Sequence, residues 1–248
     1  MFENKIEFSA HEIYVNLKDS YPIRAILNLP EWHKKLNHTW PNKTVKGCMP
    51  FLDSMSAGYI LKLPQDFYIN HNFTKEDGQK DSTFACPMSN ESDLLNLHFV
   101  NLNKQGNEHH SPQQLHGSPH LEKNNNQGVL KVMNPWRIKT PPGYSCLFVP
   151  PLNNSDDRFS IIPGIVDTDT YNKEVNFPFI INGDKYETLE TTLKKGTPYV
   201  QVIPFKRESW KMVIKGKKSK DMVEERFGFY LKFLHNYKTL YWNKKSWK

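Results

Sequence analysis

Cysteine is scarce in this sequence, and its spacing excludes two common kinds of small stabilised domain. Among 248 residues there are three cysteines, Cys48, Cys86 and Cys146, and none forms a Cys-x-x-Cys pair. An odd number without that spacing indicates neither a disulfide framework nor a zinc knuckle. We therefore expect three free thiols that are buried as small hydrophobic side chains.

Long apolar runs are also missing. No stretch reaches the ~20 apolar residues that a transmembrane helix needs. The first five residues lack the charged and then apolar order of a secretory signal. We therefore expect no membrane partner and a cytoplasmic location.

The widely shared catalytic and phosphate-binding motifs are absent as well. There is no Gly-x-Ser-x-Gly elbow, P-loop, Gly-x-Gly-x-x-Gly fingerprint or His-Glu-x-x-His pair. Four of the ten histidines fall in a polar stretch, about residues 103–128, that we predict to be a mobile or functional loop. Their spacing matches no known site, so we predict no metal site, with metal binding by this stretch as the alternative.

Positive charge is present, and it is concentrated at one end. The formal net charge is +7, but residues 206–248 hold 13 Lys and Arg against 4 Asp and Glu, which leaves the preceding residues with a net charge of −2. Such a basic tail can contact nucleic acid, a phosphorylated ligand or an acidic protein, or it can be a solvated helix face.

Proline and glycine divide the middle of the chain into short β-type segments. With 38% hydrophobic residues, the chain can form a single domain over 1–248. We predict a mainly β (α+β) fold, with an antiparallel β-sandwich or β-clip-like core, irregular N-terminal segments and a turn at 48–58. A short helix is predicted at 31–36, after Pro30. The predicted strands are 59–63, 66–70, 94–102, 129–133, 136–139, 144–149, 159–162, 177–181 and 199–205.

The end of the chain changes period. Large apolar residues recur at three- and four-residue steps between Ser219 and Trp242, which predicts an amphipathic helix over about 219–242. Its aromatic face would pack on the protein's own sheet, on a second copy or on a protein partner. A homo-oligomer is therefore one expectation.

Three polar turns are the candidate functional segments. The first runs from Gly164 to Tyr171 and contains Asp167 and Asp169, the candidate catalytic residues. The second, residues 141–145, would present Tyr144 and Ser145 toward the same cleft, although it also reads as a rigid turn. The third, at 53–58, would join them. Short carboxylates in turns also accept backbone N–H bonds. Asp167 and Asp169 could therefore stabilise the turn itself, which is the alternative to a functional role.

Five segments together resemble an uncharacterised family of bacteria and tailed phages. They are 48–59, 141–145 (Pro-Pro-Gly-Tyr-Ser, by which the family is recognised), 166–171, 176–179 and 201–208. This resemblance covers most of the chain and implies no activity. A phage-encoded protein would lie in the host cytoplasm or the virion.

A second, partial resemblance covers about residues 143–207. Gly164 to Tyr171 and Lys195 to Ile203 resemble two elements of the dUTPase and dCTP-deaminase superfamily, whose fold is a β-clip. The resemblance implies that Asp167 deprotonates a water, that Tyr171 stacks on a deoxyribose, and that Gln201 makes a polar contact near the phosphates. Mg²⁺ would be needed only with a nucleotide.

The sequence departs from that superfamily in several places. It has no Arg-Ser-Ser phosphate-binding segment, no Gly-rich aromatic tail and no deaminase glutamate, and its turn is one residue longer between Asp167 and Tyr171. Three functions stay open: a pocket for a small phosphorylated or nucleotide-like ligand, with or without catalysis; a non-catalytic assembly or virion-associated protein; and nucleic-acid binding through the basic tail.

Overall fold

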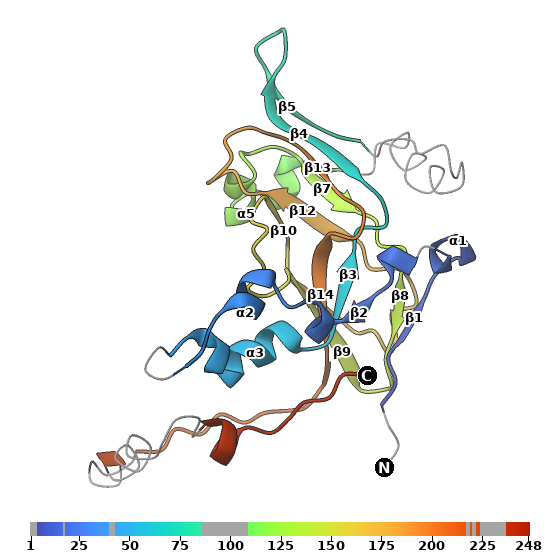
Figure 1. The fold of residues 1–248 in the computed structure, drawn as a ribbon. Coiled ribbons are helices and arrows are strands. Elements are labelled where there is room, and N and C mark those ends of the chain that lie inside the picture. The colour runs from blue at the N-terminus through green and yellow to red at the C-terminus, as the bar shows by residue number, and fades with distance from the viewer. Residues whose placement is uncertain are drawn as a thin grey trace.

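The computed structural model describes residues 4–16, 18–39, 43–85, 109–216, 219, 222–223 and 237–248, and its fold is mainly β. The described strands form antiparallel sheets of two, three, four and five strands (Figure 1). The predicted mainly β class is therefore confirmed.

The five-stranded sheet has the order β11-β9-β14-β3-β2, and it holds the candidate site at one end. Its central strand, β14, is nine residues long and pairs with β9 on one side and with β3 on the other. Tyr199, Val200 and Val202 of this strand are buried, as a strand covered on both sides requires. The bounds are β2 Ile23–Arg24, β3 Tyr59–Lys62, β9 Tyr144–Val149, β11 Gly164–Val166 and β14 Pro198–Lys206.

The remaining strands form three further sheets. The four-stranded sheet has the order β10-β12-β7-β6, the three-stranded sheet β13-β4-β5, and the two-stranded sheet β1-β8. Their bounds are β1 Glu7–Ser9, β4 Phe67–Thr74, β5 Lys80–Ala85, β6 His109–His110, β7 Val129–Val132, β8 Arg137–Lys139, β10 Phe159–Ile161, β12 Phe177–Ile181 and β13 Leu189–Leu193.

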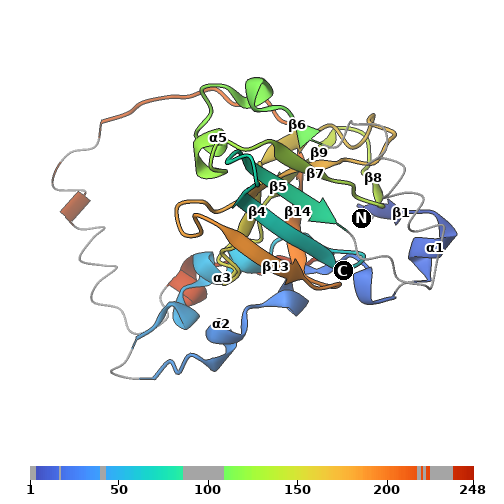
Figure 2. The ribbon, with the colours of Figure 1, turned by 90° about the horizontal axis from the view of Figure 1, so that it is seen from above.

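The described helices are short. Both views place α2 and α3 side by side and apart from α1 and β1 (Figure 2). The bounds of the α-helices are α1 Glu12–Val15, α2 Glu31–Lys35, α3 Met49–Ser56 and α5 Pro119–Lys123; the 3-10 helices are η1 Lys18–Ser20, η2 Ala25–Asn28, η3 Val45–Gly47 and η4 Pro112–Leu115, and a π-helix, η5, spans Tyr237–Tyr241.

Aromatic rings join the sheets in the core. Phe177 of β12 contacts Phe148 of β9 and Tyr199 of β14, with ring centroids 5.3 Å and 5.9 Å apart. All three side chains are almost completely buried. Full burial of one such ring contributes about 1.5–3 kcal/mol, so these contacts hold the five-stranded and four-stranded sheets together.

The predicted turn at 48–58 is wrong, because most of it forms the helix α3. Pro50 lies in the first turn of this helix, where its missing N–H is not needed. Met49 and Met55 are buried on one face. The chain reverses only at Gly58, whose φ of +69° an L side chain rarely adopts.

The remaining predictions have different outcomes. The helix predicted at 31–36 is confirmed as α2. The helix predicted at 219–242 lies largely outside the described residues, as do the strand predicted at 94–102 and the start of the polar stretch. The described part of that stretch, 109–128, contains β6, η4 and α5.

Gly58→Ala should destabilise the protein more than a positive φ alone explains. A Cβ at this position would overlap the backbone carbonyl oxygen of Val202 in β14, so both strain and a clash follow. We expect a loss of about 3 kcal/mol or more in chemical denaturation. Gly78→Ala is the matched control, since Gly78 has a φ of +79° with nothing near its Cβ, and should cost about 1 kcal/mol. Equal losses would contradict this account.

Candidate functional site

The candidate site forms where three strands of the five-stranded sheet end together. Val166, the last residue of β11, pairs with Cys146 of β9, and Tyr144 at the start of β9 pairs with Lys206 at the end of β14. Antiparallel pairing therefore brings residues just after 166, just before 146 and just after 206 to one edge. These residues include Asp167, Asp169, Ser145 and Arg207.

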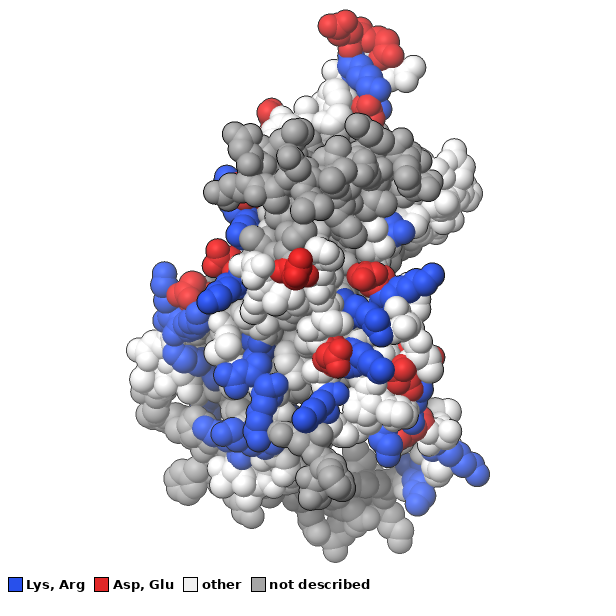
Figure 3. Space-filling model, turned by 90° about the vertical axis from the view of Figure 1, so that its right-hand side faces the viewer, with Lys and Arg blue, Asp and Glu red and all other residues white. Residues whose placement is uncertain are grey.

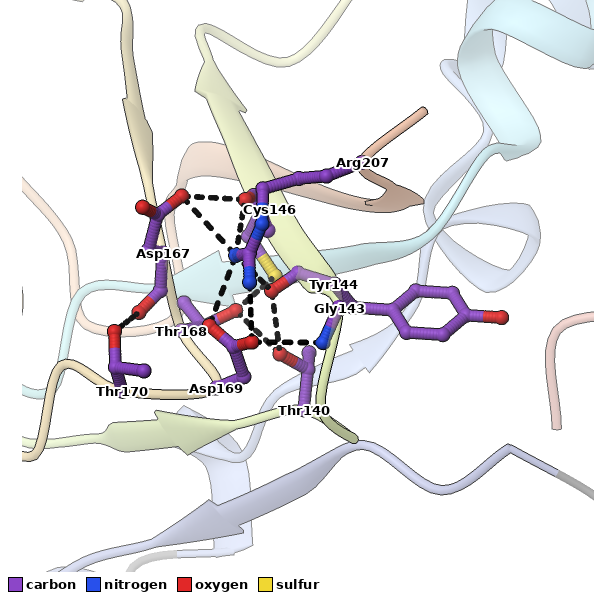
Figure 4. A network of polar contacts seen from close by, with 10 residues as sticks. Thr140, Gly143, Tyr144, Cys146, Asp167, Thr168, Asp169, Thr170 and Arg207 are labelled. Carbon is purple, nitrogen blue, oxygen red and sulfur yellow. Dashed lines mark hydrogen bonds and ion pairs between the residues drawn. The ribbon is translucent and has the colours of Figure 1, made fainter. Parts of the chain in front are cut away.

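Arg207 is the centre of the polar network at this edge (Figure 4). Its Nη1 donates to Asp169 Oδ1 at 2.9 Å and to the Ser145 hydroxyl at 3.0 Å, and its Nη2 donates to Asp169 Oδ2. The same Nη1 lies 3.2 Å from Asp167 Oδ1, which accepts a bond from the Ser145 hydroxyl at 2.6 Å. One guanidinium thus forms ion pairs with both candidate catalytic carboxylates.

The two aspartates differ strongly in exposure. The Asp169 side chain is 6% exposed, whereas the Asp167 side chain is 60% exposed. Asp169 Oδ2 also accepts the N–H of Gly143 at 2.8 Å. The hydrogen bonds from Arg207, followed by that from Gly143, lower the pKa of Asp169 to about 2, against the opposing effect of burial. These bonds account for the position of Asp169 without any ligand.

Backbone bonds make the turn after β11 rigid. The Asp167 carbonyl accepts the N–H groups of Thr170 and Tyr171, at 3.1 Å and 2.8 Å, and also the Thr170 hydroxyl. Tyr171 is 43% exposed at the end of this turn. Asp167, Thr170 and Tyr171 are the exposed members of the turn.

A buried hydroxyl pair lies beneath the turn. Thr168 and Thr140 share a hydrogen bond of 2.7 Å, and the Thr168 hydroxyl lies 3.3 Å from Cys146 Sγ. Burial raises the pKa of Cys146 to about 11, so its thiol stays protonated and unreactive. The expectation of a buried free thiol holds for Cys146 and is wrong for Cys48, which is exposed; Cys86 lies outside the described residues.

Tyr144 and Ser145 point to opposite sides of β9, because side chains alternate along a strand. Ser145 is fully buried and reaches Asp167, whereas the Tyr144 ring points away from the network, and its hydroxyl accepts a bond of 2.7 Å from Asn4 Nδ2 (Figure 4). The structure thus joins Ser145 to the Asp167 turn and places Tyr144 elsewhere.

Tyr144 lines a cleft of about 560 Å³ that the sequence did not predict. Segments from the start, the middle and the end of the described chain form its walls. Three lysines line it, Lys5, Lys206 and Lys248, together with four aromatic residues, Tyr59, Tyr144, Phe205 and Trp247.

The last residues are fixed at this cleft by specific contacts. The Tyr59 hydroxyl donates to the Lys248 carbonyl at 3.1 Å, and the Tyr59 and Trp247 rings meet edge to face. Trp242 Nε1 and Lys245 Nζ both donate to Asp53 Oδ2 on α3, at 2.9 Å and 2.6 Å. Asp53, predicted to join the Asp167 turn, is therefore bound to the C-terminal segment.

Gln201 has a different setting from the one that the superfamily resemblance implies. It is 1% exposed, and its Nε2 donates to the Ser54 and Ala57 carbonyls, both at 2.8 Å. Its Oε1 accepts the N–H of Leu152 at 3.0 Å. These bonds satisfy carbonyls at the end of α3 and fasten that helix to β14. A ligand contact by Gln201 stays a prediction.

Comparisons with known proteins add no family: no protein-family model matches the chain, and no curated protein matches it significantly. Within the described ranges, no group of three or more His, Cys, Asp or Glu residues could hold a metal ion. None of the described helices is long and apolar enough to span a membrane.

Asp169→Asn should lower stability at neutral pH and weaken its dependence on acid. Because the pKa of Asp169 is lower in the folded protein than its ordinary value of 3.8, its contribution is complete above pH 3.8 and is lost as the pH falls toward about 2. The unfolding temperature, followed by circular dichroism from pH 5 to pH 2, should fall less steeply in the variant.

Asp184→Asn is the control for this experiment, since Asp184 is exposed. It should reproduce the acid profile of the wild type. An Asp169→Asn profile parallel to the wild type would contradict the role given to the Arg207 contact.

Proposed function

We propose that this protein binds a small phosphorylated ligand with a flat ring, of the nucleotide kind, in the cleft lined by Tyr144. The observation that carries the proposal is the joint presence of three lysines and four aromatic side chains around one cleft of about 560 Å³. Pockets for small molecules and cofactors have about this size, with largely apolar walls and a few placed polar groups.

The lysines supply the charge that a phosphate needs. Lys5, Lys206 and Lys248 come from three separate segments and line the same space. A lysine ammonium binds phosphate as a compact point charge with three donors. Lys206 also forms an exposed ion pair of 3.3 Å with Glu208; such pairs are weak in water, so a phosphate can replace it.

The aromatic residues supply the surface for a ring. Tyr59, Tyr144 and Trp247 line the cleft, and Trp247 is held against Tyr59. Stacking of a base on an aromatic side chain is worth about 1–3 kcal/mol by alanine substitution and tolerates different bases. The cleft therefore favours aromatic ring compounds as a class rather than one particular base.

The Asp167 turn supports this cleft from behind. The Gly143 N–H binds Asp169, and the Gly143 carbonyl accepts the Arg207 N–H at 2.8 Å, so both sides of the residue before Tyr144 are fixed. A hydrolase activity is a second proposal that rests on the superfamily resemblance and concerns the exposed side of the Asp167 turn, because neither Asp167 nor Tyr171 lines the cleft. A β-clip arrangement over 143–207, with Asp167 as the base, Tyr171 at the sugar and Mg²⁺ on the phosphates, would follow from the superfamily resemblance.

A thermal-shift screen with deoxynucleotides, ribonucleotides and sugar phosphates, with and without Mg²⁺, tests the proposal. A ligand at 100 times its Kd stabilises a protein by about 2.7 kcal/mol, which should raise the melting temperature by about 5–10 °C in a chain of this size. The double variant Lys5→Gln with Lys206→Gln should lose most of this shift.

The matched control is Lys139→Gln with Lys173→Gln, which removes the same charge from exposed residues that do not line the cleft. Absence of any shift, or an equal loss in both double variants, would contradict a ligand site in this cleft. Asp167→Asn separates the two proposals, because it should leave binding intact and abolish only turnover.

A further inference from the structure

A second cavity, of about 240 Å³, lies at the opposite end of the five-stranded sheet from the Asp167 turn. The turn lies where β9 begins and β14 ends, whereas the cavity lies where β9 ends and β14 begins. Pro150 follows β9 directly and Pro198 begins β14, and both line the cavity. Phe159 of β10 and Asn182, which follows β12, line it from the four-stranded sheet. The cavity therefore lies between the two sheets.

Three prolines make one wall of this cavity rigid, and we call it the proline pocket. They are Pro150, Pro151 and Pro198. The ring of a proline fixes its φ angle, so this wall has little backbone freedom before a ligand binds. A wall that is already ordered loses little conformational entropy on binding, which favours affinity for a small compound. The same rings present C–H groups, so the wall is also apolar.

Hydrogen bonds fix the loop after the prolines, residues 152–157, which forms another wall of the proline pocket. Near its start, Asn153 Nδ2 donates to the Ser54 hydroxyl at 3.1 Å. At its end, the Asp157 carbonyl accepts a bond of 3.0 Å from Asn182 Nδ2. The pocket is therefore formed without a ligand, as most sites for small molecules are.

The charges that line the proline pocket do not suit a phosphate. Two carboxylates, Asp156 and Asp157, line it together with one lysine, Lys123. A phosphate there would lie beside two charges of its own sign. Lys123 is the last residue of α5, which lies on the left of Figure 1, whereas Lys and Arg side chains gather over the middle and lower parts of the right-hand face shown in Figure 3. An anionic ligand would therefore be attracted to that other face.

Both carboxylates of the proline pocket already have cationic partners. Arg158 binds Asp156 through Nε at 3.0 Å and through Nη2 at 2.8 Å. Lys185 pairs with Asp157, whose Oδ1 also accepts the Tyr186 hydroxyl at 2.9 Å. An amine ligand would have to displace one of these partners. A neutral hydroxyl group can bind beside them, because a carboxylate accepts about four hydrogen bonds.

Amide and hydroxyl side chains complete the lining of the proline pocket. They are Asn153, Asn154, Asn182 and Ser160. An amide both donates and accepts hydrogen bonds, as a ligand hydroxyl group does. A sugar or cyclitol ring has hydroxyl groups at its edge and C–H groups on its faces, so it suits these side chains and the proline wall together. The volume is below the roughly 300–1,000 Å³ of sites for larger ligands, so the pocket suits a single ring.

We propose that the proline pocket binds a neutral, hydroxyl-rich ligand of the size of one sugar ring. Its hydroxyl groups bond to Asp157, Asn154 and Ser160, and its C–H groups lie against the prolines. This inference is independent of the proposed nucleotide-like ligand, because no residue that lines the proline pocket also lines the cleft of Tyr144.

Ligand-observed NMR titration of the full chain tests the proposal, with glucose, galactose, mannose and myo-inositol as probes. At least one probe should bind. The double variant Asn154→Leu with Ser160→Ala should raise its Kd at least about 10-fold, because two hydrogen-bonding side chains are lost from the pocket. The matched control is Asn16→Leu with Ser111→Ala, which should leave the Kd unchanged, since both residues are exposed and neither lines the pocket.

Asp157→Asn is a second variant, which keeps the shape of a side chain that is 45% exposed. It should raise the Kd several-fold, because a charged acceptor is lost, and it decides the test if melting temperatures show that the double variant does not fold. Absence of binding by all four probes overturns the proposal, as does a Kd that the folded variants leave unchanged. Binding of butylamine or inorganic phosphate in place of the four probes overturns the assigned ligand class.

Discussion

The contact between Arg207 and Asp169 is the constraint on which the candidate site depends. Two hydrogen bonds join a guanidinium at the end of β14 to a carboxylate in the turn after β11. Because Arg207 also binds the Ser145 hydroxyl and the Gly143 carbonyl, it fixes the start of β9 as well. Three strand ends therefore have one common anchor. Without it, two carboxylates would lie close together with no positive charge between them.

This anchor gives two faces of the sheet edge different roles. On one face, Ser145, Asp169 and Arg207 bind one another, and a ligand there would have to compete with bonds already made. On the other, Tyr144 lines a cleft together with three lysines and three further aromatic residues. We therefore interpret the network as the support of the cleft; Asp167 is exposed on the side of the network and does not line the cleft.

Much of the fold was predictable because its strands follow simple patterns. β9, β12 and β14 are apolar segments bounded by proline or glycine, and they lie where the sequence predicted strands. β5 and β13 were missed, because their sequences are mostly polar and only pairing with β4 makes them strands. α3 was missed because residues 48–58 were read as a turn, whereas Pro50 lies in the first turn of a helix that begins at Met49.

The site was predictable only in part, for a related reason. Asp167, Asp169, Tyr144 and Ser145 stood out within short turns. Their common partner Arg207 lies 38 residues beyond Asp169, and it was read as part of the basic tail and of the 201–208 segment, with no link to these turns. The cleft could not be predicted from the sequence, because Lys5, Tyr59 and Trp247 come from distant segments. The spacing of residues in a sequence predicts local turns well. A cleft depends on strand pairing and side-chain contacts between distant parts of the chain.

A double-mutant cycle on Arg207 and Asp169 tests this account most directly. Arg207→Gln, Asp169→Asn and the double variant would be compared in free energy of unfolding by urea denaturation. If the two residues act as one anchor, either single change already breaks the contact. The free energy of unfolding of the double variant should then be no lower than that of the less stable single variant. Additive losses would show that the two side chains contribute independently, and they would contradict the central role given to their contact.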